Sequence, residues 1–201
     1  MKKFILLSLL FLLSLNSFAQ KKKKKSKSKK ETSTKSVLAS ANDLIFEMNT
    51  KNGLNKMYLL AGKSKDSIPI KSFSTSEILM PTNAKVKQFT ANGTTLYNIT
   101  WTENVTTGDA SSKLENSVKT NNQIYDVSTK TKLYENIQSV VNITEIVYLD
   151  RLKNASETQR RIRKEGSEFV LNADGSFDLK GKSTTTTMFY NVKDKKYSYK
   201  K

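Results

Sequence analysis

Hydrophobic and polar residues alternate along much of the chain beyond residue 36, most clearly over residues 97–105. A period of two is that of a β-strand, whose successive side chains point to opposite faces of a sheet. This segment therefore predicts a half-buried strand of an antiparallel sheet. The apolar side holds Tyr97, Ile99, Trp101 and Val105, and the polar side holds Asn98, Thr100, Thr102 and Asn104.

Turn residues join such segments into hairpins. Asn92-Gly93 precedes the alternating segment and follows residues 86–91, and Asn-Gly between two such runs favours a two-residue hairpin loop. Two more turns are predicted at 172–176, between strands 168–171 and 177–179, and at 193–196, between strands 186–192 and 197–200. Further strands are expected at 44–48, 56–61, 68–73, 113–119, 124–127, 132–137 and 140–149.

Residues 140–149 are the most apolar of these segments, which makes them the best candidate for a central strand.

Two segments fit more than one element. Residues 156–159, Ser-Glu-Thr-Gln, match a helix capping box, but a helix there would bury only Ile162 as a strongly apolar side chain. An exposed edge strand guarded by Lys and Arg suits the same residues, and we favour it. Residues 37–43 are compatible with one helical turn before the first strand.

The fold predicted from this pattern is mainly β, a single-domain antiparallel meander over residues 37–201. A barrel of the lipocalin kind, a half-barrel and a sandwich all fit it. Only residues 97–105 approach the strands of about 10 residues that a transmembrane barrel repeats, so we do not expect an integral membrane protein.

Residues 1–19 have the features of a secretory signal peptide. Lys2 and Lys3 precede an apolar run at 4–15, and Ser17 and Ala19 provide small residues before a cleavage site. A retained membrane anchor is the alternative, but about 12 apolar residues make a helix of only ~18 Å. We expect export and a mature chain that starts at Gln20, in the periplasm, associated with the outer membrane, or outside the cell.

Positive charge is concentrated directly after this signal. The chain has 35 Lys and Arg, 18 Asp and Glu, and a formal net charge of +17. Residues 20–36 contain almost no apolar side chain, and eight lysines fall between residues 21 and 30, which predicts a disordered basic linker. These lysines are Lys21, Lys22, Lys23, Lys24, Lys25, Lys27, Lys29 and Lys30.

The folded body contains a second basic cluster, which consists of Arg160, Arg161, Arg163 and Lys164. Alternation divides it between the two faces of a strand. We interpret the lysine arm, together with this cluster, as a binding site for anionic surfaces, with an attraction of about 1 kcal/mol per Lys near such a surface. A solubilising spacer and a solvated strand edge are the alternatives. Candidate partners are an anionic envelope lipid or glycan, or another envelope protein; export makes nucleic acid a less expected partner.

Composition excludes several chemistries, because the chain has no Cys and no His. It therefore offers no thiol nucleophile, no imidazole base and no Cys/His metal site, and we expect no metal and no cofactor. Residues 172–178 resemble a calcium loop, but Val170 and Gly181 stand where its first and last carboxylates belong, which favours a plain turn.

Carboxylate pairs remain as the one available acid/base chemistry. The candidates on predicted strands are Glu103, Glu115, Glu135, Glu145 and Asp150. No spacing selects a pair, and we expect solvated strand faces. Tyr190, Tyr197 and Tyr199 are compatible with stacking on sugars, but core packing is the simpler interpretation.

The sequence favours an exported, non-catalytic, envelope-associated binding or structural protein. The alternative is a lipocalin-like carrier of an apolar small molecule, with a large cavity lined by aromatic residues. A carboxylate-based glycan hydrolase is the third and less favoured hypothesis.

Overall fold

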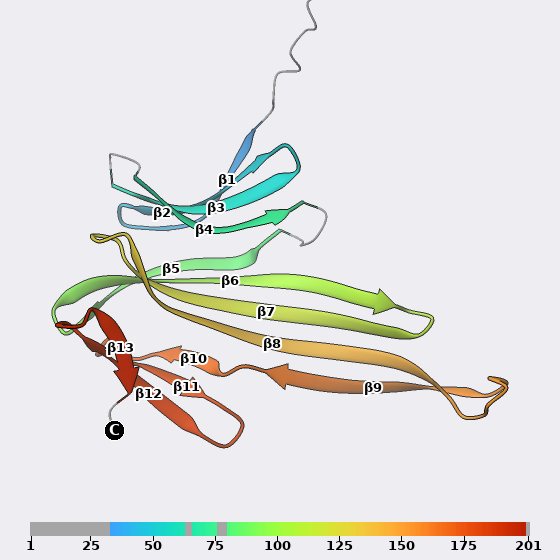
Figure 1. The fold of residues 1–201 in the computed structure, drawn as a ribbon. Coiled ribbons are helices and arrows are strands. Elements are labelled where there is room, and N and C mark those ends of the chain that lie inside the picture. The colour runs from blue at the N-terminus through green and yellow to red at the C-terminus, as the bar shows by residue number, and fades with distance from the viewer. Residues whose placement is uncertain (1–32, 63–65, 76–79, 200–201) are drawn as a thin grey trace, which may run out of the picture. The chain divides into compact units, whose positions relative to one another are not determined.

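The computed structural model describes residues 33–62, 66–75 and 80–199, and every regular element in these residues is a β-strand. The predicted signal peptide and the eight lysines of the arm lie outside this part of the chain. The thirteen strands form three antiparallel sheets in which neighbours along the chain are neighbours in the sheet (Figure 1). The predicted all-β antiparallel fold is confirmed.

Sheet 1 has four strands in the order β1-β2-β3-β4. They are β1 (Thr34–Ala41), β2 (Leu44–Lys51), β3 (Leu54–Ala61) and β4 (Asp66–Ser74). The helical turn allowed at residues 37–43 is wrong. These residues instead belong mostly to β1, which pairs with β2 across a bulge between Val37 and Ala39. β1 begins at Thr34, inside the segment 20–36 that is expected to be a disordered linker. From Thr34 onward its backbone pairs with β2.

Sheet 2 has five strands and includes the longest ones. They are β5 (Thr82–Ala91), β6 (Thr94–Asp109), β7 (Lys113–Asp126), β8 (Thr131–Tyr148) and β9 (Ser156–Glu165). The expected central strand lies in β8, between β7 and β9. The helix considered at residues 156–164 is absent, and the favoured edge strand, β9, stands in its place.

Sheet 3 consists of β10 (Glu168–Leu171), β11 (Phe177–Lys180), β12 (Thr185–Asn191) and β13 (Lys196–Tyr199). Its two predicted turns are confirmed at residues 172–176 and 192–195. The sequence resembling a calcium loop is the first of these turns, in which the Asp174 carboxylate accepts the Ser176 N–H at 2.9 Å. This bond and that from the Ser176 hydroxyl hold the pKa of Asp174 below its usual value.

β7 and β8 are each one continuous strand, whereas the pattern predicted two strands in each place. In β7 the polar run Asn121-Asn122-Gln123 lies between the two expected strands, 113–119 and 124–127. It does not break the strand, because it pairs with β6 on one side and β8 on the other. Its side chains also bond across strands, as Asn122 does with Thr100 at 2.8 Å and Gln123 with Glu135 at 2.7 Å.

Hairpin loops follow the rule for right-twisted strands. Asn92 and Gly93 have φ angles of 47° and 79°, and Asn52 and Gly53 have 53° and 74°. Positive φ at both central residues matches the strand twist, and Asn and Gly adopt it at low cost. The Asn92-Gly93 hairpin is confirmed, and Asn52-Gly53 is a second one of the same kind.

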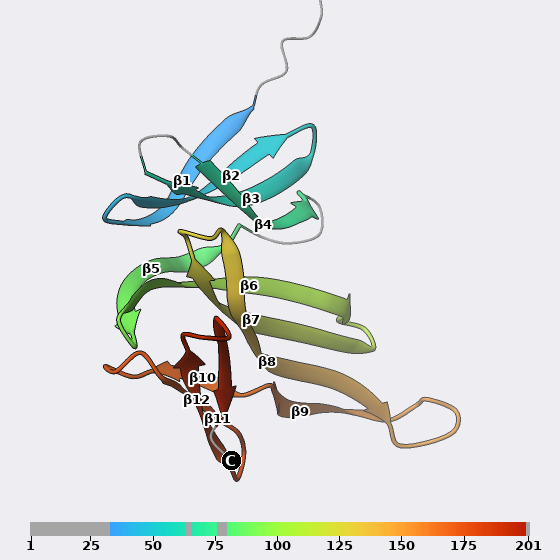
Figure 2. The ribbon, with the colours of Figure 1, turned by 60° about the vertical axis from the view of Figure 1, so that its left-hand side comes forward.

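Sheet 2 is buried on both faces near the start of β6. The face we call the Trp101 face, defined by Ile99 and Trp101, packs against sheet 1, where Phe46 lies 5.7 Å from Trp101 between ring centroids. The opposite face, called the Asn122 face after its central residue, packs through Leu96 and Ile124 against sheet 3. The turned view shows sheets 1 and 3 on opposite sides of sheet 2 (Figure 2).

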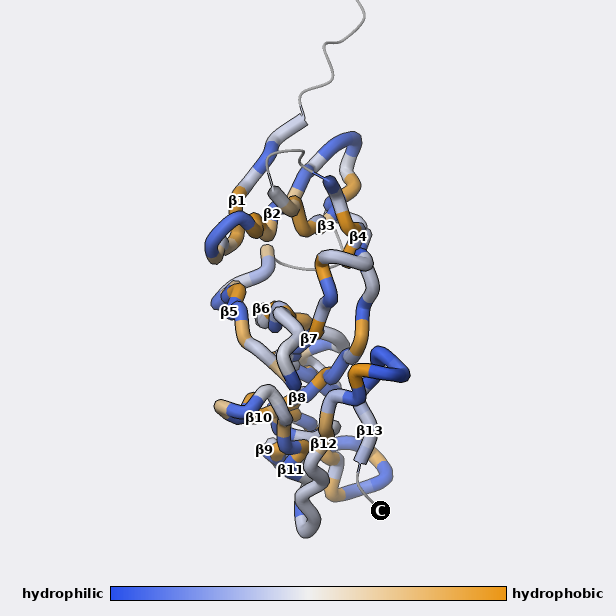
Figure 3. Tube along the Cα trace, turned by 90° about the vertical axis from the view of Figure 1, so that its left-hand side faces the viewer, coloured by the Kyte–Doolittle hydropathy of each residue, from blue (hydrophilic) through white to orange (hydrophobic). Residues whose placement is uncertain are grey.

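Phe177 is the centre of the second cluster, in contact with Phe169 and Tyr197 at 4.8 Å and with Tyr134 at 4.4 Å. Fully burying such a side chain stabilises the fold by about 1.5–3 kcal/mol. Hydrophobic positions alternate with hydrophilic ones along the strands (Figure 3). The two clusters therefore draw on opposite faces of the same strands of sheet 2.

Gly175 provides a test of how sheet 3 fits against sheet 2. It has a φ of +81°, and a Cβ there would lie 2.4 Å from the Thr90 carbonyl oxygen and 2.6 Å from the Ala91 Cα. Gly93 has nearly the same φ, +79°, with nothing within 4 Å of its Cβ position. We expect Gly93→Ala to lower the free energy of unfolding by about 1–2 kcal/mol, because only the left-handed backbone conformation is unfavourable for alanine there. Gly175→Ala is expected to lower the free energy of unfolding by about 1–3 kcal/mol more, because its methyl group would also clash with the backbone of β5.

Urea unfolding of the two variants measures the difference. Equal losses of stability would show that the close approach of the β10–β11 turn to β5 is not required by the fold.

Candidate functional site

β9 carries the basic cluster predicted from the sequence. All ten of its residues are exposed, and it pairs with β8 alone among the described strands. Lys and Arg on such an edge discourage pairing with another chain. The alternation of the strand sends Arg161 and Arg163 to the Trp101 face, and Arg160 and Lys164 to the Asn122 face.

Arg161 and Arg163 are neutralised by acids on their own face. Arg161 Nη2 lies 3.0 Å from a Glu145 oxygen, and Arg163 contacts Glu115 at 3.3 Å and Glu165 at 2.6 Å. A hydrogen bond from Lys113, together with Arg163, holds the pKa of Glu115 below its usual value. Beside β9, the Trp101 face therefore consists of paired charges, and each pair is worth little in stability.

Arg160 and Lys164 form no ion pair with the residues that the structure describes. Their strand, β9, borders one part of the Asn122 face. We call this part the outer part: it begins at Thr100 and Asn122 and extends along the strands away from sheet 3. In both ribbon views β6, β7 and β8 project beyond sheet 3 here (Figures 1 and 2). Between the edge strands it consists of Thr100, Thr102, Asn104, Thr106, Gly108, Leu114, Asn116, Val118, Thr120, Asn122, Asn136, Gln138, Val140, Asn142 and Thr144.

The outer part of the Asn122 face has no acidic residue within the described strands of sheet 2. Lys85 and Lys87 point to this face from β5 at one edge, paired with Thr100 and Asn98, and Arg160 and Lys164 do so from β9 at the other. These four cations are exposed. The result is a face of amides, hydroxyls and a few aliphatic side chains, flanked by four cations that form no ion pair within the described part of the chain.

The candidate carboxylates lie on the other face, with the exception of Asp150. Asp150 follows the end of β8, where its Oδ1 accepts the Asn154 N–H at 2.8 Å, so its expected place on a strand is wrong. Glu115, Glu135 and Glu145 each bond to a cation. They are held apart in separate charge pairs, and the structure does not single out two of them as an acid and a base.

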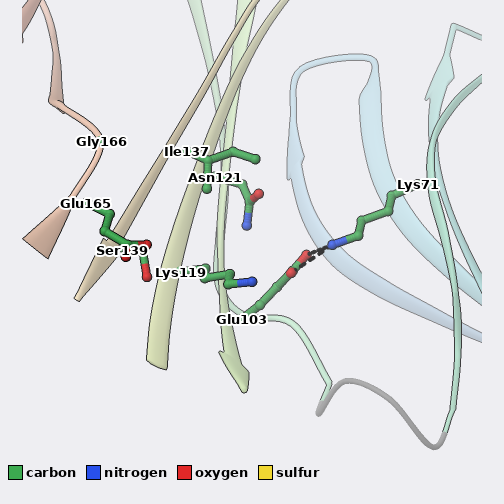
Figure 4. A pocket seen from close by; sticks show the side chains of 8 residues that line it. All are labelled: Lys71, Glu103, Lys119, Asn121, Ile137, Ser139, Glu165 and Gly166. Atoms are coloured by element: carbon green, nitrogen blue, oxygen red, sulfur yellow. Dashed lines mark hydrogen bonds and ion pairs between the residues drawn. The ribbon is translucent and has the colours of Figure 1, made fainter. Parts of the chain in front are cut away.

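Glu103 contradicts the expectation of a solvated carboxylate. Its side chain is 3% exposed, and its two oxygens accept the Lys71 ammonium at 2.7 and 2.8 Å. The Trp101 indole N–H adds a bond of 2.8 Å. Lys71 extends from β4 of sheet 1 to reach it (Figure 4). This buried pair joins two sheets, and no local pattern of residues predicts it because its partners stand 32 residues apart in the chain.

Two of the three tyrosines considered for stacking are core residues. Tyr190 and Tyr197 are 4% and 8% exposed and lie in the Phe177 cluster. The Tyr197 hydroxyl donates to the Gly175 carbonyl at 2.8 Å, and burial raises its pKa. Tyr199 is exposed. The packing interpretation is confirmed for Tyr190 and Tyr197.

The outer part of the Asn122 face was missed by reasoning from charge clusters. Its signal in the sequence is the Asn and Thr at every second position of residues 98–106, opposite the buried apolar side. Recognising the whole face requires the register of β7, β8 and β9, which the sequence does not state.

Comparisons with known proteins give no match: no family model, no curated protein and no solved structure is similar to this chain. The described residues contain no helix long and apolar enough to cross a membrane.

Glu103 tests the importance of the link between sheets 1 and 2. We expect Glu103→Gln to lower the free energy of unfolding by about 1–3 kcal/mol, because a buried charged hydrogen bond is lost. Glu115→Gln removes the same charge from the same face of sheet 2 at a more exposed position, and we expect a clearly smaller loss. Urea denaturation measures both. A Glu103→Gln variant as stable as the control would contradict a structural role for the pair.

Proposed function

We propose that this protein is an exported, non-catalytic binding protein of the cell envelope that holds an anionic glycan against the Asn122 face of sheet 2. The single observation that carries this proposal is the acid-free outer part of that face, with Lys85 and Lys87 at one edge and Arg160 and Lys164 at the other. Six glutamates of the same sheet lie on the opposite face, so the face carries charge of one sign.

The chemistry of the face suits a hydroxylated anionic chain. Asn, Gln and Thr side chains both donate and accept hydrogen bonds, as sugar hydroxyls do. An Arg guanidinium binds a carboxylate or sulfate through two parallel bonds, and Lys adds a point charge. Neighbouring strands lie about 4.8 Å apart, so a glycan crossing several strands meets successive rows of such groups.

A glycan fits this face better than a lipid surface. Insertion into a bilayer interface needs a broad apolar surface. On this side of the described strands of sheet 2, the exposed large apolar side chains are Val118, Ile162 and, at the far end of β8, Tyr148, at 40%, 68% and 47% exposure. Charge attraction to anionic lipid headgroups needs no insertion. Binding to lipid is therefore the competing outcome of the experiment.

Export and the lysine arm belong to the same proposal and rest on the sequence of residues 1–36. A signal peptide at 1–19 places the protein in the periplasm, at the outer membrane or outside the cell. The arm then adds attraction that falls with salt, because charges more than about 8–10 Å apart are screened at physiological ionic strength.

We also infer that the three sheets stack as layers, in the manner of a sandwich rather than a barrel. The support is that sheet 2 contributes to an apolar cluster on each face. A lipocalin-like carrier is not favoured, because Trp101 is 1% exposed and packs against Phe46 instead of lining a cavity. The separate charge pairs of the glutamates likewise give no support to a hydrolase.

The binding face is tested by two double variants of one strand. Arg160→Gln with Lys164→Gln removes two charges from the Asn122 face, and Arg161→Gln with Arg163→Gln removes two from the Trp101 face. We expect the first pair to weaken binding to polygalacturonate and dextran sulfate about tenfold, which equals about 1.4 kcal/mol. We expect the second pair to have little effect. Calorimetric titration at low and high salt measures the affinities, with uncharged dextran as the control ligand.

Equal losses from the two double variants would show that net charge, not this face, governs binding. Failure of the wild type to bind either anionic glycan would overturn the proposal. Binding to phosphatidylglycerol vesicles but not to glycans would assign the face to lipid.

The arm and the export signal are tested in the producing cells. We expect a chain that starts at Gln20 and an association with the envelope that high salt or deletion of residues 21–30 weakens. Fractionation at two salt concentrations and mass spectrometry of the N-terminus measure both. A freely soluble protein with and without the arm would show that the arm is a spacer.

A further inference from the structure

A polar hollow of about 310 Å³ lies over the Trp101 face, on the side of sheet 2 opposite the proposed glycan surface. One row of side chains crosses its floor: Glu103 on β6 pairs with Lys119 on β7, Lys119 with Ser139 on β8, and Ser139 with Glu165 on β9. Lys71 reaches it from β4 (Figure 4). The remaining lining residues are Asn121, Ile137 and Gly166. The volume is within the usual range of about 300–1,000 Å³ for small-molecule sites.

Asn121 is the observation that points to a ligand. The residue is 4% exposed, and its Nδ2 is buried without a hydrogen-bond partner among the described residues. A buried donor left unpaired costs about 1–3 kcal/mol, and native structures rarely keep one without a purpose. In Figure 4 the amide nitrogen points into the space beside Lys119.

Lys119 supplies a second donor at the same place. It forms no ion pair within the described part of the chain. The other charges at the hollow are already matched, since Lys71 bonds to Glu103 at 2.7 Å and Glu165 to Arg163 at 2.6 Å. The site is left with one excess positive charge and one unpaired amide donor.

We propose that this hollow binds the carboxylate of a small polar acid, which accepts hydrogen bonds from Lys119 Nζ and Asn121 Nδ2. A single excess charge matches a monoanion better than a dianionic phosphate. The ligand's carbon skeleton lies on Ile137, whose side chain is 49% exposed at the wall. The buried Ser139 carries a hydroxyl, bonded to Ser117 at 2.9 Å, that is available to a hydroxyl of the ligand.

Gly166, at the rim of the hollow, lets the chain pass close to the backbone of β8. Its φ is +75°, and a Cβ there would lie 2.2 Å from the Ile137 carbonyl oxygen. Two classes of compound carry the required carboxylate: sugar acids and acylated amino acids.

The experiment is a titration of the full chain with D-glucuronate and N-acetylglycine, with methyl glucoside as the uncharged control. Two-dimensional NMR follows the Asn121 side-chain NH₂. We expect saturable shifts with at least one acid and none with methyl glucoside. The stronger of the two acids identifies the class of ligand.

Three variants of β7 locate the site. Lys119→Gln removes the free charge, and Asn121→Asp replaces the donor by an acceptor of the same shape. Each is expected to weaken binding about tenfold, equal to about 1.4 kcal/mol. Lys113→Gln removes a charge from the same face of the same strand but outside the hollow, and it should bind as the wild type does. The NMR spectrum of each variant shows whether it is folded.

Absence of saturable shifts in the wild type overturns the proposal, as does an equal loss in Lys113→Gln. Tighter binding of inorganic phosphate than of either acid overturns the carboxylate assignment. If the wild type bound neither acid and Asn121→Asp were more stable than the wild type, the result would show instead that the position of residue 121 suits an ion pair with Lys119. The site is independent of the glycan surface, so Arg160→Gln with Lys164→Gln should leave acid binding unchanged.

Discussion

The two-residue period of sheet 2 is the constraint on which the other features depend. Trp101 must face sheet 1 while Leu96, five residues earlier on β6, must face sheet 3. A slip of one residue would bury Thr100 in place of Trp101, which would exchange an apolar contact for an unpaired polar group. Because both apolar clusters must form, the register of β6 is fixed. Backbone pairing between neighbouring strands then fixes the registers of β7, β8 and β9.

This register also sorts the charges. The glutamates of sheet 2 occupy strand positions that point to the same face as Trp101. Arg161 and Arg163 pair with glutamates on that face. Arg160 and Lys164 point to the opposite face, where their neighbours within the described strands are amides, hydroxyls and aliphatic side chains, with no acid. One strand with an ordinary mixture of charges therefore presents a neutralised lattice on one side and unpaired cations on the other. Such a division favours different ligands on the two faces.

Local signals predicted the strands and failed where the structure is decided by distant residues. Asn92-Gly93 and the alternation of residues 97–105 were sufficient for a hairpin, because turn chemistry and periodicity act over a few residues. The strands expected at 113–119 and 124–127 form one strand, because neighbours on two sides pair the backbone of the polar run at Asn121 between them. The burial of Glu103 depends on Lys71 in another sheet. The hollow and the acid-free face depend on the register of several strands, which no short pattern encodes.

Glu103 marks the boundary between the dry core and the polar hollow. It follows Ile99 and Trp101 on the same face of β6, and it is bonded to Trp101 on one side and to Lys71 from sheet 1 on the other. By binding both oxygens of Glu103, Lys71 leaves Lys119 as the unpaired cation beside Asn121. If Lys71 were absent, Lys119, its neighbour in the row, would be the nearest candidate to neutralise this carboxylate. The pair that links the two sheets is therefore also what keeps a donor available for an acid.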